Sequence, residues 1–208
     1  MELEAANSKN SSTNSSNTSS SFTSSGAYYI ATLMHDNFRR LEALPLVSVA
    51  LVEGKAIGGG AEVVASTDLR VFAADAQIGF VHGRLGLTPG FGGGCRLVRL
   101  LGPTRALQMM LSARPVGVAV AKELGLVEHV ISEGISSGGA SLGATIAWYH
   151  AHYGSISVHA SRHLKAIVGQ AAASLTMAEA LKFEAAAFQA VWGSEEHRAS
   201  LANNVKHN

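Results

Sequence analysis

The sequence predicts an α/β fold in which strands and helices alternate along the chain. The first observation is an apolar run rich in β-branched residues at 47–52, which leads through glycines into a short helix. The second is another apolar strand, at 69–73, directly after that helix. The third is a C-terminal part with helical periodicity. This alternation implies parallel strands joined by right-handed crossovers.

Composition limits the classes of function. The chain has 208 residues, is 47% hydrophobic and 15% charged, and has a formal net charge of +1. This is enough for one globular core, and the balanced charge gives no electrostatic reason to bind nucleic acid or a membrane surface. A single cysteine, Cys95, excludes an internal disulfide. We therefore expect a cytoplasmic protein, or a mitochondrial one if the natural N-terminus is longer, with neither nucleic acid nor membrane among its partners.

The chain divides into three parts by composition. Seventeen of the first 25 residues are Ser, Thr or Asn, and such a segment cannot bury enough apolar surface to offset the entropy lost on ordering. We expect a disordered tail at 1–25, an α/β core at 26–135 and a C-terminal helical region at 136–208.

The N-terminal half of the core is expected to contain one long helix. Apolar residues three to four positions apart over 26–44 predict an amphipathic helix, which Pro45 ends. The elements that follow are a strand at 47–52, a turn at Gly54-Lys55, a short helix over 62–67 and a strand at 69–73.

Helices dominate the remainder of the chain. Thr104 is a good N-cap for a helix over 105–112. Thr176 and Glu179 have capping-box spacing at the start of the clearest amphipathic helix, 175–192. The other expected elements are helices at 95–101 and 118–124, a helical stretch at 146–168 with an interruption near Gly154, a strand at 126–131, a loop or weak helix start at 133–143 and a short helix in the tail.

Two glycine clusters indicate where a ligand could bind. At the strand-to-helix junction of residues 58–60, glycines let the backbone approach a ligand, and the first amides of the helix have no internal acceptor. Such a junction can hold an oxyanion: a phosphate, a carboxylate or the enolate oxygen of a thioester. Glu62 places a carboxylate beside it. Residues 92–94 form a second loop that passes close to another group.

Nucleotide-binding motifs fit the first cluster poorly. A Walker loop requires Gly-Lys-Ser/Thr after the glycines, whereas Ala61-Glu62 follows here, and the spacing of residues 58–60 does not match a dinucleotide fingerprint. A tight turn without chemistry remains an alternative for this segment alone.

Six motifs together resemble the crotonase (enoyl-CoA hydratase/isomerase) superfamily in their order and spacing. The resemblance covers residues 26–206. The motifs are Pro45-Leu46-Val47-Ser48-Val49, Gly58-Gly59-Gly60-Ala61-Glu62, Thr67-Asp68-Leu69-Arg70, Leu85-Gly86-Leu87-Thr88-Pro89-Gly90, Gly92-Gly93-Gly94-Cys95-Arg96-Leu97 and Ala121-Lys122-Glu123-Leu124-Gly125-Leu126-Val127.

The resemblance implies a fold, a substrate and an assembly. The fold is a crotonase-like spiral of ββα turns. The substrate is an acyl-CoA thioester, so coenzyme A enters as part of the substrate and no separate cofactor or metal is expected. The assembly is a homotrimer, or a hexamer built from trimers.

The resemblance also assigns roles to residues. In the family, two backbone amides hold the thioester oxygen as an enolate, and the second of them falls on Gly59. Two glutamates act as a general acid/base pair in the hydratases; the first falls on Glu62, and the second is replaced by His82. The positions expected to bind substrate are Ala56, Ile57, Gly58, Pro89 and Gly90.

His82 changes the expected reaction. Hydration needs two groups that together place one water, whereas decarboxylation needs enolate stabilisation and a proton donor for Cα, a role open to an imidazole. Phe80-Val81-His82 and Ala190-Val191-Trp192-Gly193 resemble the family members that decarboxylate alkylmalonyl-CoA thioesters. We therefore expect an acyl-CoA decarboxylase. The alternatives are an enoyl-CoA hydratase and a truncated, inactive acyl-CoA-binding or oligomerising subunit.

The segment before the first helix departs from the family pattern. Family members carry an Ala-x-Gly-x-Asp-like motif there, which supplies the first oxyanion amide, whereas this chain has the Ser/Asn-rich stretch. We expect an N-terminally incomplete fold, in which the loss of one oxyanion donor costs about 3 kcal/mol of transition-state stabilisation.

Overall fold

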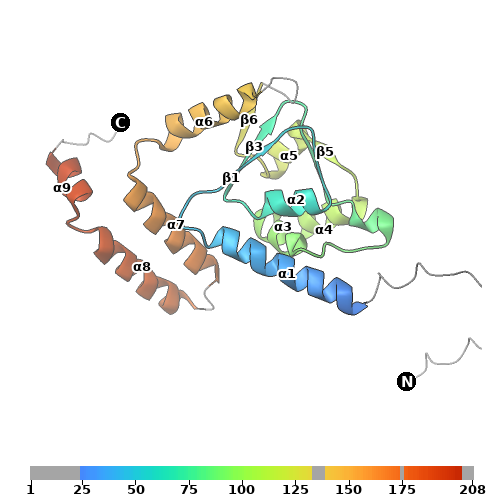
Figure 1. The fold of residues 1–208 in the computed structure, drawn as a ribbon, viewed down its shortest axis with the longest axis horizontal. Coiled ribbons are helices and arrows are strands. Elements are labelled where there is room, and N and C mark those ends of the chain that lie inside the picture. Colours follow the sequence, from blue (N-terminus) through green and yellow to red (C-terminus); the bar gives the residue numbers. More distant parts are fainter. Residues whose placement is uncertain (1–23, 133–138, 174–175, 203–208) are drawn as a thin grey trace, which may run out of the picture.

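The computed structural model describes residues 24–132, 139–173 and 176–202 (Figure 1). The described part begins with α1 (Ser24–Glu42) and continues as β1 (Val49–Val52), β2 (Lys55–Ile57), α2 (Gly59–Ala65), β3 (Leu69–Ala73), β4 (Gln77–Gly79), the 3-10 helix η1 (His82–Leu85), α3 (Gly93–Leu101), α4 (Pro103–Ser112), β5 (Val116–Gly117), α5 (Val118–Leu124) and β6 (His129–Ile131). The C-terminal region consists of α6 (Ala140–Tyr153), α7 (Val158–Ala173), α8 (Met177–Val191) and α9 (Glu195–Ala202).

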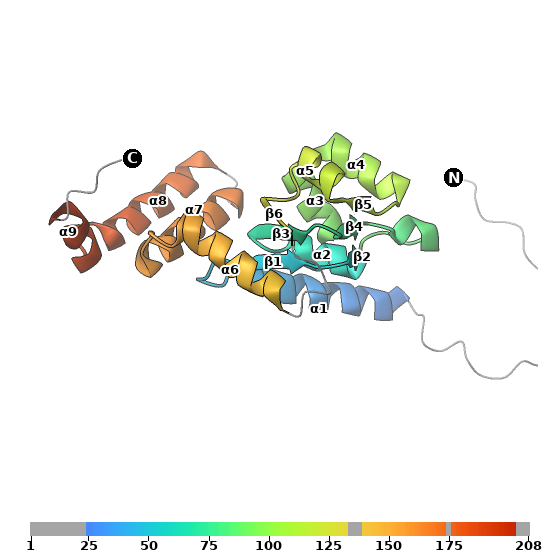
Figure 2. The same ribbon diagram turned by 90° about the horizontal axis from the view of Figure 1, so that it is seen from above.

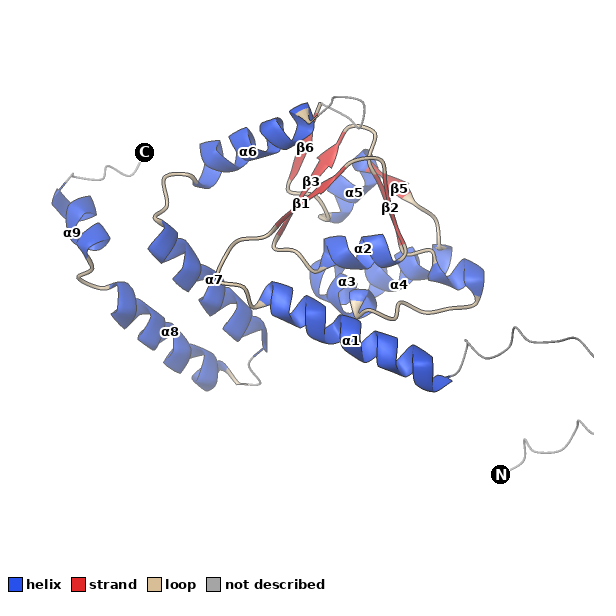
Figure 3. Cartoon of the chain, viewed as in Figure 1, coloured by secondary structure: helices blue, strands red, loops and turns tan. Residues whose placement is uncertain are grey.

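The strands form two three-stranded sheets, ordered β1-β3-β6 and β2-β4-β5. β1 pairs in parallel with β3, and β2 pairs in parallel with β4. The chain therefore passes from a strand of one sheet to a strand of the other and then into a helix, and the next turn stacks on the first. This is the predicted spiral of ββα turns, and the α/β fold class is confirmed (Figure 3).

Two local predictions were wrong. Residue 55 was expected in a turn, but it begins β2, and Gly54 alone turns the chain, at a φ of 65°. Strands of three residues are too short to show a periodicity. Gly102, not Thr104, is the N-cap of α4, because Pro103 occupies the first helical position, where its missing N–H costs nothing.

Two helix boundaries were predicted correctly. α5 ends at Gly125, which adopts a φ of 84° that glycine tolerates. Thr176 and Glu179 form the expected capping box at the start of α8. The expected disordered tail lies, up to residue 23, outside the described residues, as does part of the expected loop at 133–143.

The main core lies between the strands and α2–α5. Its buried side chains come from both sheets and from these helices, and include Val52, Phe72, Ile78, Phe80, Leu97, Met109 and Leu126. A second cluster joins Val71, Ala73 and Ile131 to Trp148 of α6. In Figure 2, α4 and α5 lie on one side of the strands, and α1 and α6 lie on the other.

The C-terminal helices reach away from this core. α7 and α8 lie side by side, with α9 beyond them (Figures 1 and 2). Lys165 of α7 connects them to the core, because its Nζ lies 2.8 Å from the carboxylate of Asp68. The same carboxylate accepts hydrogen bonds from the backbone N–H and the hydroxyl of Ser48. None of the described helices is long and apolar enough to cross a membrane.

Candidate active site

Glu62 is the centre of the site, and Gly58 determines where it lies. Gly58 adopts φ 58° and ψ −119°, a conformation that residues with a Cβ avoid. Its N–H donates to the carbonyl of Gly79 on β4, and its carbonyl accepts the N–H of Glu62. The chain thus turns from β2 into α2 within one residue. This turn directs Glu62 inward, so that only 1% of the residue is exposed.

The two oxygens of the Glu62 carboxylate have different partners. Oε1 lies 3.1 Å from Nε2 of His82. Oε2 accepts hydrogen bonds from the backbone N–H groups of Phe91, at 2.9 Å, and Gly93, at 2.8 Å. A buried charge needs such partners. Because both lone pairs of Oε2 are occupied, any proton taken up by Glu62 would lie on Oε1, the oxygen that faces His82.

His82 faces Glu62 through one ring nitrogen only. Its Nδ1 is buried and has no hydrogen-bond partner among the described residues. A buried N–H without a partner costs about 1–3 kcal/mol, so the tautomer with its proton on Nε2 fits this environment. In that tautomer Nε2 donates to Oε1 of Glu62, and Nδ1 carries a bare lone pair. In this tautomer His82 therefore donates a hydrogen bond to Glu62.

The second glycine cluster makes the close approach that its sequence predicted. A Cβ on Gly93 would lie 2.4 Å from Cγ of Glu62, far inside contact distance. Gly93 also begins α3, with Gly92 as N-cap at a φ of 85°. The carboxylate of Glu62 therefore lies against the positive end of α3, where N–H groups point outward.

The other predicted residues lie on β2, at the start of α2 and in the segment before Phe91. Gly59 begins α2, and the ring of Phe91 packs so closely over it that an added Cβ would lie 3.1 Å from that ring. The predicted substrate-binding residues are half-buried: Ala56 and Ile57 on β2, next to Gly58, and Pro89 and Gly90 in the segment before Phe91. Their contact with substrate stays a prediction.

Sequence reasoning missed the groups that hold Glu62. The donors from Phe91 and Gly93 are main-chain amides, which leave no side-chain signature; the run of three glycines at 92–94 was the only signal for them. Arg96 pairs with Glu42 and lies 5.5 Å from the ring centroid of Phe38.

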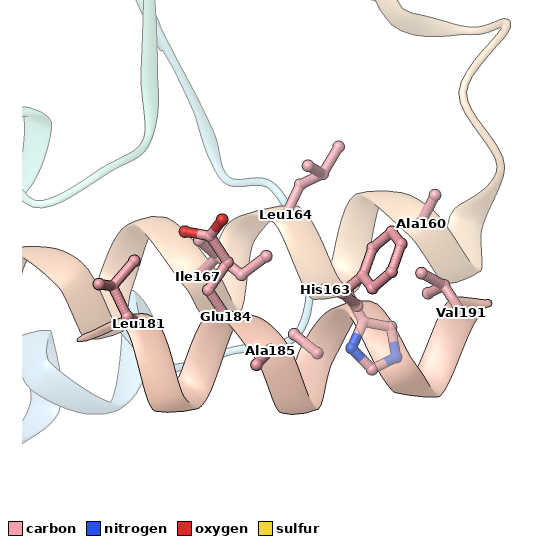
Figure 4. A pocket seen from close by; sticks show the side chains of 10 residues that line it. Ala160, His163, Leu164, Ile167, Leu181, Glu184, Ala185 and Val191 are labelled. Carbon is pink, nitrogen blue, oxygen red and sulfur yellow. The ribbon is translucent and has the colours of Figure 1, made fainter. Parts of the chain in front are cut away.

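An apolar groove lies between α7 and α8, apart from this site (Figure 4). Leu164 and Ile167 of α7 and Leu181 and Val191 of α8 line it, together with Phe188. None of the predicted site residues is among its lining residues. Within the described ranges, no three side chains of the metal-ligating types converge.

The chain is similar to several known enzymes and solved structures. An ethylmalonyl-CoA decarboxylase from Danio rerio is 39% identical over 174 residues, which are 84% of this chain and 57% of that protein. An enoyl-CoA hydratase from Bacillus anthracis superposes with a TM-score of 0.76 at 25% identity, over 87% of this chain and 67% of the other. An enoyl-CoA hydratase-like structure from Thermobifida fusca, solved with CoA, superposes with a TM-score of 0.68 at 27% identity, over 89% of this chain and 70% of the other.

The chain thus spans somewhat more than half the length of the decarboxylase that it matches. The family profile described as enoyl-CoA hydratase/isomerase matches residues 24–206, nearly all of the described chain. Both glycine clusters, Glu62 and His82 lie within the matched range. The chain therefore belongs to the enoyl-CoA hydratase/isomerase (crotonase) family.

Proposed function

We propose that the chain decarboxylates an alkylmalonyl-CoA thioester such as ethylmalonyl-CoA. The observation that carries the proposal is the direct contact between His82 Nε2 and Glu62 Oε1, at 3.1 Å. Two groups that hold one water between them must be about 5 Å apart, because each hydrogen bond needs about 2.8 Å. A directly bonded pair suits the storage of one proton better than the placement of a water.

The proposed reaction has two steps. Loss of CO₂ breaks the bond between Cα and the carboxylate and leaves the electron pair on the thioester as an enolate. The N–H of Gly59, in the first turn of α2, would stabilise the enolate oxygen. One further proton, held between Oε1 of Glu62 and Nε2 of His82 in addition to the proton of the neutral imidazole, would then pass to Cα. This leaves the Glu62 carboxylate and neutral His82, and solvent would restore the proton to the pair.

The test compares two thioesters. Purified chain is incubated separately with ethylmalonyl-CoA and with crotonyl-CoA, and the CoA products are identified by mass spectrometry. We expect loss of CO₂ from the first and no addition of water to the second. Absence of turnover in a folded sample would overturn the proposal in favour of a binding or oligomerising subunit.

Hydration is the second candidate. It is favoured by the similarity to solved structures of enoyl-CoA hydratases and by a buried glutamate in the first turns of α2. Addition of water to crotonyl-CoA, without loss of CO₂ from ethylmalonyl-CoA, would select it over decarboxylation.

The proposal extends to assembly. We place the chain in a homotrimer, or a hexamer of trimers, as the family resemblance implies. The support is the set of exposed apolar side chains on α8, where Phe188 is 55% exposed and Trp192, just after the helix, is 65% exposed. Exposed apolar patches of this kind mark interaction surfaces.

A further inference from the structure

Arg96 contacts the loop that holds Glu62, although it touches neither Glu62 nor His82. Its Nη1 donates to the carbonyl oxygen of Phe91, at 3.2 Å. Nε and Nη2 donate to the two carboxylate oxygens of Glu42 on α1, at 2.6 and 2.9 Å. Only 13% of the Arg96 side chain is exposed. A bidentate guanidinium–carboxylate contact of this kind fixes the orientation of the arginine as well as its position.

The carbonyl that Arg96 holds lies between the two amides that bind Glu62. The N–H of Phe91 belongs to the peptide before it, and the N–H of Gly93 belongs to the peptide after Gly92. Both donate to the same oxygen, Oε2. The peptide between them presents the carbonyl of Phe91 to Arg96. An uncompensated change of ψ at Phe91 or of φ at Gly92 would turn the two flanking amides relative to each other, so that they could no longer both donate to Oε2.

The peptide between Phe91 and Gly92 needs contacts from outside the loop to fix its orientation, because Gly92 itself restricts the backbone little. Gly92, at a φ of 85°, has access to more backbone conformations than any other residue type would have there. The guanidinium packs directly on it, since a Cβ added to Gly92 would lie 2.5 Å from Nη1 of Arg96. The rings of Phe38 and Phe91 meet edge to face, 6.4 Å apart. Contacts from α1 and α3 thus converge on one peptide group.

We propose that Arg96 is a positioning residue for the Glu62–His82 pair. By fixing the peptide between Phe91 and Gly92, it keeps both amides on Oε2, which leaves Oε1 directed at His82. Glu42 contributes by orienting Arg96, so α1 takes part in the site without contacting it. The positioning role itself does not depend on the proposed function. Only its expected effect on turnover rests on that proposal.

The first test is Arg96→Lys, which keeps the positive charge and loses the planar fork. In NMR spectra of labelled protein, we expect the Phe91 and Gly93 amide signals and the His82 ring nitrogen signals to move and broaden. Turnover of ethylmalonyl-CoA should fall about 10- to 100-fold in kcat, with a change in KM of less than about twofold. The matched control is Arg99→Lys, on the exposed face of the same helix, and it should change neither readout.

A second variant guards against a loss of folding. Glu42→Gln leaves Arg96 and the loop intact but removes the charge that orients the guanidinium, and it should move the same signals in the same direction by less. Unchanged Phe91, Gly93 and His82 signals in both folded variants would overturn the inference, whether or not the protein turns over a thioester. Displaced signals in a protein without turnover would support Arg96 as a positioning residue and overturn the proposed function.

Discussion

At the scale of single residues, the site is one carboxylate whose two oxygens are used differently. Oε2 of Glu62 is occupied by two main-chain donors, and Oε1 faces His82. The arrangement gives the carboxylate one open position for a proton. Substitutions that disturb either side should therefore affect chemistry more than they affect folding.

Glu62→Gln should remove activity while keeping the fold. To accept from Phe91 and Gly93, the new amide must point its oxygen at them and its NH₂ at His82. His82 must then accept on Nε2 and carry its proton on the buried Nδ1, which costs about 1–3 kcal/mol. We expect turnover to fall at least about 100-fold and the free energy of unfolding to fall by about 1–3 kcal/mol, measured by urea titration. A variant with full turnover would contradict this role for Glu62.

Gly93→Ala tests the close approach directly. The added methyl would overlap Cγ of Glu62, at 2.4 Å, so we expect a loss of about 1–3 kcal/mol of stability and displaced His82 signals in NMR spectra. Gly94→Ala is the matched control, since its methyl would meet only Met110 Sδ, at 3.5 Å, and Pro89 beyond it. Equal losses in the two variants would show that the approach to Glu62 is not what requires Gly93.

At the scale of elements, α6 is joined to the first sheet through stacked rings. His129 of β6 stacks on Trp148 of α6, with ring centroids 5.0 Å apart, and His152 lies 6.3 Å from His129. Burial lowers the pKa of His129 below its ordinary value of 6.5, and the positive charges of His152 and Lys122 lower it further. The folded protein thus favours the neutral ring at this contact.

Acid should therefore loosen the contact between β6 and α6. Below about pH 6.5 the unfolded chain binds a proton at His129 more readily than the folded chain does, so stability falls as the pH falls from there toward the lower folded pKa. Urea titrations between about pH 7.5 and about pH 5.5 should show this loss. His129→Phe keeps a ring and removes the proton, and a pH-dependent loss equal to that of the wild type would refute the assignment.

Some elements could be predicted from the sequence and others could not. β3 and α5 carry enough apolar periodicity to be placed correctly, and Gly58 to Glu62 form a recognisable strand-to-helix junction. β2 and β4, with three residues each, carry no usable period. The contact between Arg96 and Glu42 joins residues 54 positions apart, so only the fold could bring it to light.

At the scale of the whole molecule, the C-terminal helices leave several large apolar side chains exposed to solvent. Phe188, which lines the groove between α7 and α8, and Trp192 are both more than half exposed. We expect sedimentation equilibrium to give the mass of three chains or six. Phe188→Ser combined with Trp192→Ser should shift the mass toward one chain. Leu107→Ser, equally exposed at 53% on α4, should not, and a wild-type monomer would contradict the proposed assembly.

The central claim is that His82 and Glu62 share the proton that reaches Cα, and one comparison tests it most directly. The rate of CO₂ loss from ethylmalonyl-CoA is measured for the wild type and for His82→Ala, with folding of both checked by circular dichroism. The account predicts decarboxylation by the wild type and a rate at least about 100-fold lower in the variant. Decarboxylation by His82→Ala at the full rate would contradict it.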